Sequence, residues 1–309
     1  MINRVSLACA ILAAAGAAAA TEPAPAPFAA GRPLGAVNGA GDFVPLTGNV
    51  KVYGSFRFAE SCVFDADRDL LVVMSAGVPE AQAGNDGYVS LVNPDGTVHT
   101  AKWIGATRDG LTLNHPLGSA LRDGRLYTAD IDTVRTFDLE TGRPGPAWPL
   151  PGATFLNGIA VSDDGTVYVS NTRPESRVYR IAPAGDVSVF VDGAPLAAPN
   201  GVAIDADGNV VVVNVDDNAV LTFDPDGKLV ATDSAPESGN DGLVILPDGT
   251  RYVSSVRYGS VADVTPGKDP KIIAAGIPNA ASMCYDPVRR QLVVPMNDNN
   301  AVAFIELAN

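Results

Sequence analysis

A block of 15 residues that recurs six times is the feature of this chain that most constrains its fold. Each copy has a polar or small residue, a second small residue, three apolar residues, a turn of the D-x-D-G type and a short β-branched run. The clearest copies are NGIAVSDDGTVYVSN from Asn157, NGVAIDADGNVVVVN from Asn200 and DGLVILPDGTRYVSS from Asp241. Looser copies begin at Glu60, Leu117 and Ala281. Six copies of one motif predict six copies of one structural unit.

The spacing of the copies indicates what that unit is. Successive copies begin 57, 40, 43, 41 and 40 residues apart, in the range typical of four-stranded propeller blades. Two further alternating segments follow each motif, such as SRVYRIAP and DVSVFVDG, so each unit supplies about four short strands. Helical periodicity is absent between the copies, which argues against a parallel α/β sheet, and a sandwich would not repeat at this interval. We therefore predict an all-β fold, a six-bladed β-propeller.

The N-terminus predicts an exported protein. Residues 1–4 form a short, positively charged start, and residues 5–20 are a run of small apolar residues. The alanines before Thr21 offer a cleavage site. The run is shorter than the roughly 20 apolar residues that a membrane span needs, so we expect a signal peptide at 1–20 and no membrane span. Residues 21–48 are rich in Pro, Ala and Gly and predict a linker or loosely draped leader. The propeller then occupies 49–309 as one domain, in the periplasm or secreted.

The charge of the chain limits its partners. The formal net charge is −14, whereas binding to a phosphate backbone needs clustered Lys and Arg that release counterions. Nucleic acid is therefore excluded as a partner. We expect a monomer that acts on a small-molecule substrate.

Propeller symmetry converts sequence register into a spatial prediction, because each blade places the same strand against the central channel. The first register of that strand reads Glu60, Leu117, Asn157, Asn200, Asp241 and Ala281. The second register is small throughout, as expected where six backbones crowd together: Ser61, Gly118, Gly158, Gly201, Gly242 and Ser282. The fifth register predicts packing between blades: Phe64, Leu121, Val161, Ile204, Ile245 and Tyr285.

Only the first register carries chemistry. Two carboxylates and two carboxamides that converge on an axis form an oxygen-only cage, which hard Ca²⁺ prefers, and their two charges match that of the ion. Cys and His are absent from this register, which argues against zinc or copper. Singly, each Asn-Gly or Asp-Gly is also an ordinary turn that starts a strand, but Glu60 stands in register without such a turn. We predict that Ca²⁺, or another divalent cation, is held by Glu60, Asn157, Asn200 and Asp241.

These residues resemble a known family. The order Glu, Asn-Gly, Asn-Gly, Asp-Gly at the starts of inner strands, with repeats of the type G-x-x-Y-V-S-N, is similar to the regucalcin/senescence marker protein/gluconolactonase-like propellers and their strictosidine-synthase-like relatives. The resemblance covers nearly all of 50–309. It implies that Glu60, Asn200 and Asp241 bind a divalent ion, usually Ca²⁺, and that Asn157 contacts metal or substrate. The residues after Glu60 depart from the Gly-Pro and Trp that the family often has there.

The cage implies a reaction. An open position on Ca²⁺ would polarise a lactone or ester carbonyl, and Asp241 is the candidate base that activates a water. His115, two residues before the ring position of the second blade, is a candidate substrate-binding residue, with a plain loop residue as the alternative. The sequence thus predicts an exported Ca-dependent hydrolase. The alternative function is a non-catalytic propeller that binds a ligand or protein and holds a structural calcium, and fold alone does not choose between the two.

Two cysteines, Cys62 and Cys284, lie beyond the signal, and two interpretations of them are open. Cys62 is the third residue of its inner strand and Cys284 the fourth of its own, so they point to opposite faces of their blades. This parity permits a disulfide across the closure between the last and first blades, which an exported protein can keep. The favoured interpretation is two separate buried thiols that act as small apolar residues.

Overall fold

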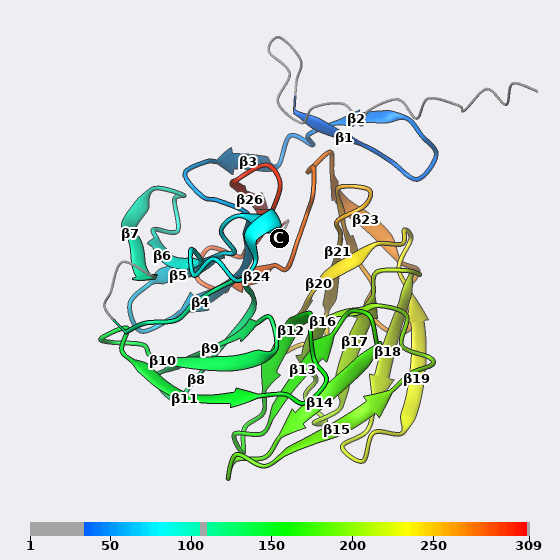
Figure 1. Cartoon of the computed structure of the whole chain (residues 1–309). Helices are drawn as coiled ribbons and strands as arrows, with labels where there is room; N and C mark the ends of the chain where they lie inside the picture. The colour runs from blue at the N-terminus through cyan, green and yellow to red at the C-terminus, as the bar shows by residue number, and fades with distance from the viewer. Residues whose placement is uncertain (1–33, 106–109, 308–309) are drawn as a thin grey trace, which may run out of the picture.

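Six four-stranded antiparallel sheets follow one another around a central axis in the computed structural model (Figure 1). It describes residues 34–105 and 110–307. Within these ranges the helical structure is limited to one 3-10 turn, η1 (Pro79–Ala81). The prediction of an all-β, six-bladed β-propeller is confirmed. The signal peptide expected at 1–20 lies outside the described residues.

Blades 1 to 5 each use consecutive strands, from the innermost to the outermost. Blade 1 comprises β4 (Ala59–Asp65), β5 (Leu70–Ser75), β6 (Tyr88–Val92) and β7 (Val98–Gly105). Blade 2 comprises β8 (Pro116–Arg122), β9 (Arg125–Asp130), β10 (Thr133–Asp138) and β11 (Pro144–Pro149). Blade 3 comprises β12 (Leu156–Val161), β13 (Val167–Asn171), β14 (Arg177–Ile181) and β15 (Val187–Asp192). Blade 4 comprises β16 (Pro199–Ile204), β17 (Val210–Asn214), β18 (Ala219–Phe223) and β19 (Leu229–Ser234). Blade 5 comprises β20 (Asn240–Ile245), β21 (Arg251–Ser255), β22 (Ser260–Asp263) and β23 (Lys271–Ala275).

Blade 6 combines the two ends of the propeller. Its first three strands are β24 (Cys284–Asp286), β25 (Gln291–Met296) and β26 (Ala301–Glu306). Its outermost strand is β3 (Val50–Tyr53), which precedes blade 1 in the chain and pairs antiparallel with β26 (Figure 1). This pairing closes the ring through backbone hydrogen bonds.

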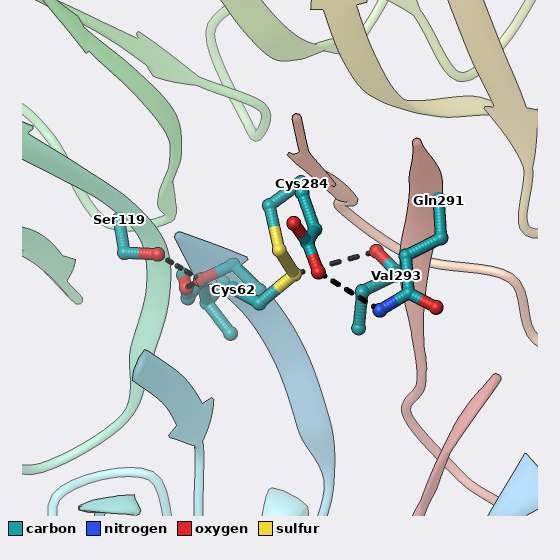
Figure 2. The surroundings of a disulfide bond; sticks show 8 residues. Cys62, Ser119, Cys284, Gln291 and Val293 are labelled. Atoms are coloured by element: carbon teal, nitrogen blue, oxygen red, sulfur yellow. Dashed lines mark hydrogen bonds between the residues drawn. A yellow bond between two sulfur atoms is a disulfide. The ribbon is translucent and has the colours of Figure 1, made fainter. Parts of the chain in front are cut away.

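A disulfide joins blade 6 to blade 1. Cys62 of β4 and Cys284 of β24 are bonded, with their Cα atoms 5.4 Å apart (Figure 2). The interpretation of two separate thiols is therefore wrong, and the parity argument for contact across the closure is confirmed. The reason is geometric: both side chains lie in the hydrophobic cluster between blades 6 and 1, together with Val293 and Phe304.

The residues just before the propeller also form strands. β1 (Gly35–Val37) and β2 (Phe43–Pro45) pair as a hairpin within the stretch expected as a leader. The backbone N–H of Gly39 donates to Glu237 Oε1 at 3.2 Å, and that of Thr47 donates to the Ala275 carbonyl at 3.1 Å. These contacts attach the hairpin segment to blade 5.

Alternation along the inner strands places apolar residues between blades. On β4, Cys62 belongs to the cluster between blades 6 and 1, whereas Val63 contacts the cluster between blades 1 and 2. Six such clusters occur, one at each interface between neighbouring blades. Each of the six fifth-register residues contacts one of them, as the sequence predicted. The core is therefore divided among the interfaces, and the inner-strand residues near the axis are left for the channel.

Candidate metal centre

A β-bulge near the start of the innermost strand redirects the first-register side chains. In blades 1 to 5, pairing between the innermost strand and its neighbour shifts register directly after the first residue of the strand. In blade 3, Leu156 and Ile159 on either side of the bulge pack toward blade 2, while Gly158 lies against blade 4. A bulge bends the strand and re-aims a side chain. Asn157 is thereby left out of the clusters on both sides of its blade.

The second register holds the first register in place around the ring. Each second-register residue contacts the main chain of the first-register residue in the next blade. The pairs are Ser61 with Leu117, Gly118 with Asn157, Gly158 with Asn200, Gly201 with Asp241, Gly242 with Ala281, and Ser282 with Glu60. A Cβ on Gly158 would lie only 2.1 Å from the Asn200 carbonyl oxygen, and one on Gly201 only 2.4 Å from that of Asp241. The small residues predicted there are thus required by direct contact.

The four predicted ligands are buried and share one property. Glu60, Asn157, Asn200 and Asp241 are each at most 4% exposed. Each has one oxygen without a hydrogen-bond partner among the described residues: Glu60 Oε2, Asn157 Oδ1, Asn200 Oδ1 and Asp241 Oδ1. The one hydrogen bond between these side chains runs from Asn200 Nδ2 to Asp241 Oδ2 at 3.1 Å. A buried polar atom without a partner costs about 1–3 kcal/mol, so four such oxygens in one register indicate a missing electropositive partner.

The electrostatics of the two carboxyl groups agree with this. Burial raises the pKa of Asp241 to about 7, although the hydrogen bond from Asn200 acts in the opposite direction. Burial and the nearby charge of Asp241 raise the pKa of Glu60 well above its usual value. Two carboxylates in a dry site repel each other, and a bound cation would favour the charged form of both.

The donor set fits a hard divalent cation. Ca²⁺ takes six to eight oxygen ligands from carboxylates, amide carbonyls and water, and the ring offers two carboxylates and two carboxamides. Ligands come from blades 1, 3, 4 and 5, which leaves coordination positions for water or substrate. Within the described ranges, no group of three or more His, Cys, Asp or Glu side chains gathers as a metal site, and the ring itself combines two carboxylates with two carboxamides.

His115 lies in the loop that leads into β8. Its backbone N–H donates to Asp130 Oδ1 at 2.6 Å, and its ring Nδ1 lies 2.9 Å from the Ala76 carbonyl oxygen. A carbonyl only accepts, so Nδ1 carries the proton and Nε2 is the acceptor in the neutral ring. Burial lowers the pKa of His115, which favours that neutral form. The ring centroid is 5.8 Å from that of Phe58, two residues before Glu60.

Asn240 is a buried polar residue that the sequence reasoning missed. It directly precedes Asp241, is 1% exposed, and neither of its side-chain polar atoms has a hydrogen-bond partner in the described part of the chain. The equivalent residues in the other blades are Ala59, Pro116, Leu156, Pro199 and Ala280, all apolar. A carboxamide in an otherwise apolar register was the available signal.

A cavity lined by the inner strands lies at the opposite end of the channel. It has a volume of about 500 Å³ and is lined by the third register of all six blades and by residues nearer the ends of the inner strands. Its third-register lining is Cys62, Ser119, Ile159, Val202, Leu243 and Met283. The small second register separates it from the ring. Its lining contains neither a carboxylate nor an imidazole.

Within the described ranges, no helix has the length and apolar character needed to cross a membrane.

Comparison with solved structures finds propellers of the same fold. A candidate gluconolactonase is 18% identical, with 88% of this chain and 97% of that chain covered and a TM-score of 0.65. A gluconolactonase from Xanthomonas campestris is 18% identical, with 93% and 99% covered and a TM-score of 0.62. Virginiamycin B lyase from Staphylococcus aureus is 11% identical, with 84% and 99% covered and a TM-score of 0.58. At these identities the likeness shows the fold alone.

Comparison of sequences identifies the family. No curated protein matches the chain at a significant level. A family model described as the SMP-30/Gluconolactonase/LRE-like region matches residues 60–240, which is more than half of the chain. The match begins at Glu60 and includes Asn157 and Asn200. The resemblance seen in the inner-strand residues is therefore confirmed: the chain belongs to the SMP-30/gluconolactonase/LRE-like family.

Proposed function

We propose that this protein is an exported, Ca²⁺-dependent hydrolase of lactones or esters. Membership of the SMP-30/gluconolactonase/LRE-like family supports a lactonase-type hydrolase at a coarse level. The observation that carries the finer proposal is the first-register ring, in which four buried oxygens lack hydrogen-bond partners. Glu60, Asn157, Asn200 and Asp241 would hold the cation. The N-terminal signal-like segment supports export.

Asp241 and Asn200 have direct parts in the proposed reaction. A cation held by the ring residues would act as a Lewis acid toward the carbonyl of the substrate. Asp241 takes a proton from a water, while Asn200 Nδ2 donates a hydrogen bond to Asp241 Oδ2 and so orients the carboxylate. The water oxygen bonds to the carbonyl carbon, the bond from that carbon to the ring or alkoxy oxygen breaks, and the leaving oxygen receives the proton from Asp241. The products are a hydroxy acid from a lactone, or an acid and an alcohol from an ester.

Two further residues contact the substrate in this proposal. Asn157 binds substrate in addition to metal, because its carboxamide lies in the same register as the other three ligands. His115 faces the substrate with Nε2, since Nδ1 is occupied by the Ala76 carbonyl. Its role is to accept a hydrogen bond from a hydroxyl group of the substrate.

The test is turnover of a panel of lactones, aryl esters and phosphotriesters by the full chain with and without Ca²⁺. We expect about one Ca²⁺ per chain by elemental analysis, and hydrolysis that a chelator abolishes. Asp241→Asn preserves shape but removes the base and one charge, so it should lower kcat by about 100-fold or more. Asp226→Asn, at an exposed turn of blade 4, is the matched control and should retain full activity.

Three outcomes contradict the proposal at different points. Full activity in Asp241→Asn places the base elsewhere. Absence of any retained divalent ion, together with a Tm that calcium does not change, eliminates the cage. Calcium binding without turnover of any panel member favours the alternative, a binding propeller with a structural calcium.

A further inference from the structure

A second cavity, of about 360 Å³, lies at the junction of blades 1 and 6. Three loops form it: the loop before β4, the loop between β5 and β6, and the loop between β25 and β26. β4 starts at this end of its blade, whereas β5 and β25 end there, so the cavity lies at the same end of the propeller as the ring. Cavities of 300–1,000 Å³ are typical of small-molecule sites.

Among the residues that line this cavity, Phe58 is the closest in sequence to a ring residue. It is two residues before Glu60, and two residues of chain span at most about 7 Å. Its aromatic ring lies 5.8 Å from that of His115, with the two planes inclined by 35°. Phe58 is half-buried, yet it contacts none of the six hydrophobic clusters found in the described residues. Packing in these clusters therefore does not account for the aromatic side chain of Phe58.

The backbone of Phe58 is held in an unfavourable conformation. Its φ is +49°, in the left-handed region, as at the equivalent residues of blades 4, 5 and 6, which are Ala198, Gly239 and Asn279. The Phe58 N–H donates to Asn300 Oδ1 at 2.7 Å, and its carbonyl accepts from the Ala76 N–H at 2.9 Å.

The rest of the lining defines what fits. Pro79 adds apolar surface beside Phe58, whereas Phe56 is only 7% exposed and belongs to the cluster between blades 6 and 1. Glu80 and Asp298 place two carboxylates against the single cation of Arg57. Aromatic rings bind other flat apolar groups by offset or edge-to-face contact. The excess of carboxylates disfavours an anionic substituent.

We propose that this cavity is a substrate subsite, in which Phe58 packs against an aromatic or other flat apolar substituent of a lactone or ester whose carbonyl lies at the metal ring. The inference rests on the proposed function and narrows it. Lactones that carry an apolar ring are preferred over unsubstituted ones, because the face of Phe58 gives such a ring a flat apolar surface to pack against.

The experiment compares kcat/KM for γ-phenyl-γ-butyrolactone and γ-butyrolactone with the calcium-loaded full chain. Wild type should prefer the phenyl compound by about tenfold or more, which corresponds to about 1.4 kcal/mol. Phe58→Ala should reduce that preference by about fivefold, mainly through KM, and Phe58→Tyr should keep it because the aromatic face remains. Phe43→Ala removes an aromatic ring that is 52% exposed in β2, and it should leave kcat/KM unchanged for both lactones.

The outcomes separate this inference from the proposed function. If both lactones are hydrolysed and Phe58→Ala leaves the preference unchanged, the subsite is overturned while the lactonase proposal stands. If neither lactone is hydrolysed, the lactonase proposal fails. The subsite is then tested by measuring the equilibrium binding of 2-phenylethanol with saturation-transfer NMR. Binding lost in Phe58→Ala supports the subsite, and equal binding overturns it. Phe58→Leu replaces Phe58→Ala if the alanine variant does not fold.

Discussion

His115 shows how one buried side chain is controlled by its surroundings. Asp130 receives hydrogen bonds from the backbone N–H groups of Asn114 and His115, which anchors the loop that carries the imidazole. Burial lowers the pKa of His115, while the Ala76 carbonyl and the charges of Asp130 and Asp86 act in the opposite direction. The neutral ring is therefore the form that the fold stabilises.

A pH dependence of stability follows from this residue. The unfolded chain has a histidine pKa near 6.5 and the folded chain a lower one, so the unfolded state binds more protons below pH 6.5. The stabilisation is fully present above pH 6.5 and is lost as pH falls through the folded pKa. His115→Gln cannot titrate, so its unfolding free energy should fall less between pH 7 and pH 5 than that of wild type. Urea unfolding at a series of pH values measures this.

The matched control for that experiment is His99→Gln. His99 is exposed on β7, and its replacement should leave the pH dependence of wild type intact. Identical pH dependence in His115→Gln and wild type would show that another group is responsible.

At the scale of the element, the bulged inner strand is the unit that builds the site. One bulge per strand turns the first-register side chain toward the axis, and the next residue must then be small, because it meets the main chain of the neighbouring blade. Side-chain size in the second register and ligand position in the first register are therefore coupled. A change in one inner strand is expected to act on the site through the next blade.

Gly201→Ala tests that coupling. Its new Cβ would lie 2.4 Å from the Asp241 carbonyl oxygen, so Asp241 must shift. We expect a loss of about 1–3 kcal/mol in unfolding free energy, as for other overpacked sites, and a calcium affinity weakened by about tenfold or more. Calorimetric titration and thermal unfolding measure the two effects. Gly48→Ala is the control, because nothing lies within 4 Å of a Cβ there; equal calcium affinity in both variants would refute the coupling.

At the scale of the whole molecule, the ring is closed twice at one junction. β3 pairs with β26, and the Cys62–Cys284 disulfide joins β4 to β24. Glu60 lies on β4 two residues before Cys62, and its carbonyl accepts from the Ser282 N–H at 3.0 Å. The closure therefore also positions the one ring ligand that comes from blade 1.

Removal of the disulfide should weaken the closure. The bridge spans a sequence separation of 222, and the loop-constraint estimate gives about 2–4 kcal/mol for a typical bridge. The double variant Cys62→Ala/Cys284→Ala should lose about this much unfolding free energy. Reductant should destabilise wild type but leave the double variant unchanged. Thiol counting on denatured, unreduced protein provides the direct check, and two free thiols there would disprove the bridge.

The fold and the positions of the ring residues were predictable from the repeat. A blade cannot bury its apolar faces alone, so copies of one motif must stack in order, and their register places Glu60, Asn157, Asn200 and Asp241 at one level. The small second register was likewise visible in the sequence. Asn240 and Phe58 were not singled out, because their importance depends on what surrounds them and not on the motif.

The sequence by itself determined the number of blades, the strand against the axis and the residues that share each level, since all of these follow from contacts within one repeat and between neighbouring repeats. Only the tertiary structure decided how the ring closes, that Cys62 meets Cys284, and that Asn300 accepts a hydrogen bond from the Phe58 N–H. These pairs lie 222 and 242 residues apart. The periodicity of the repeat does not predict such contacts, because they form only when the last blade meets the first.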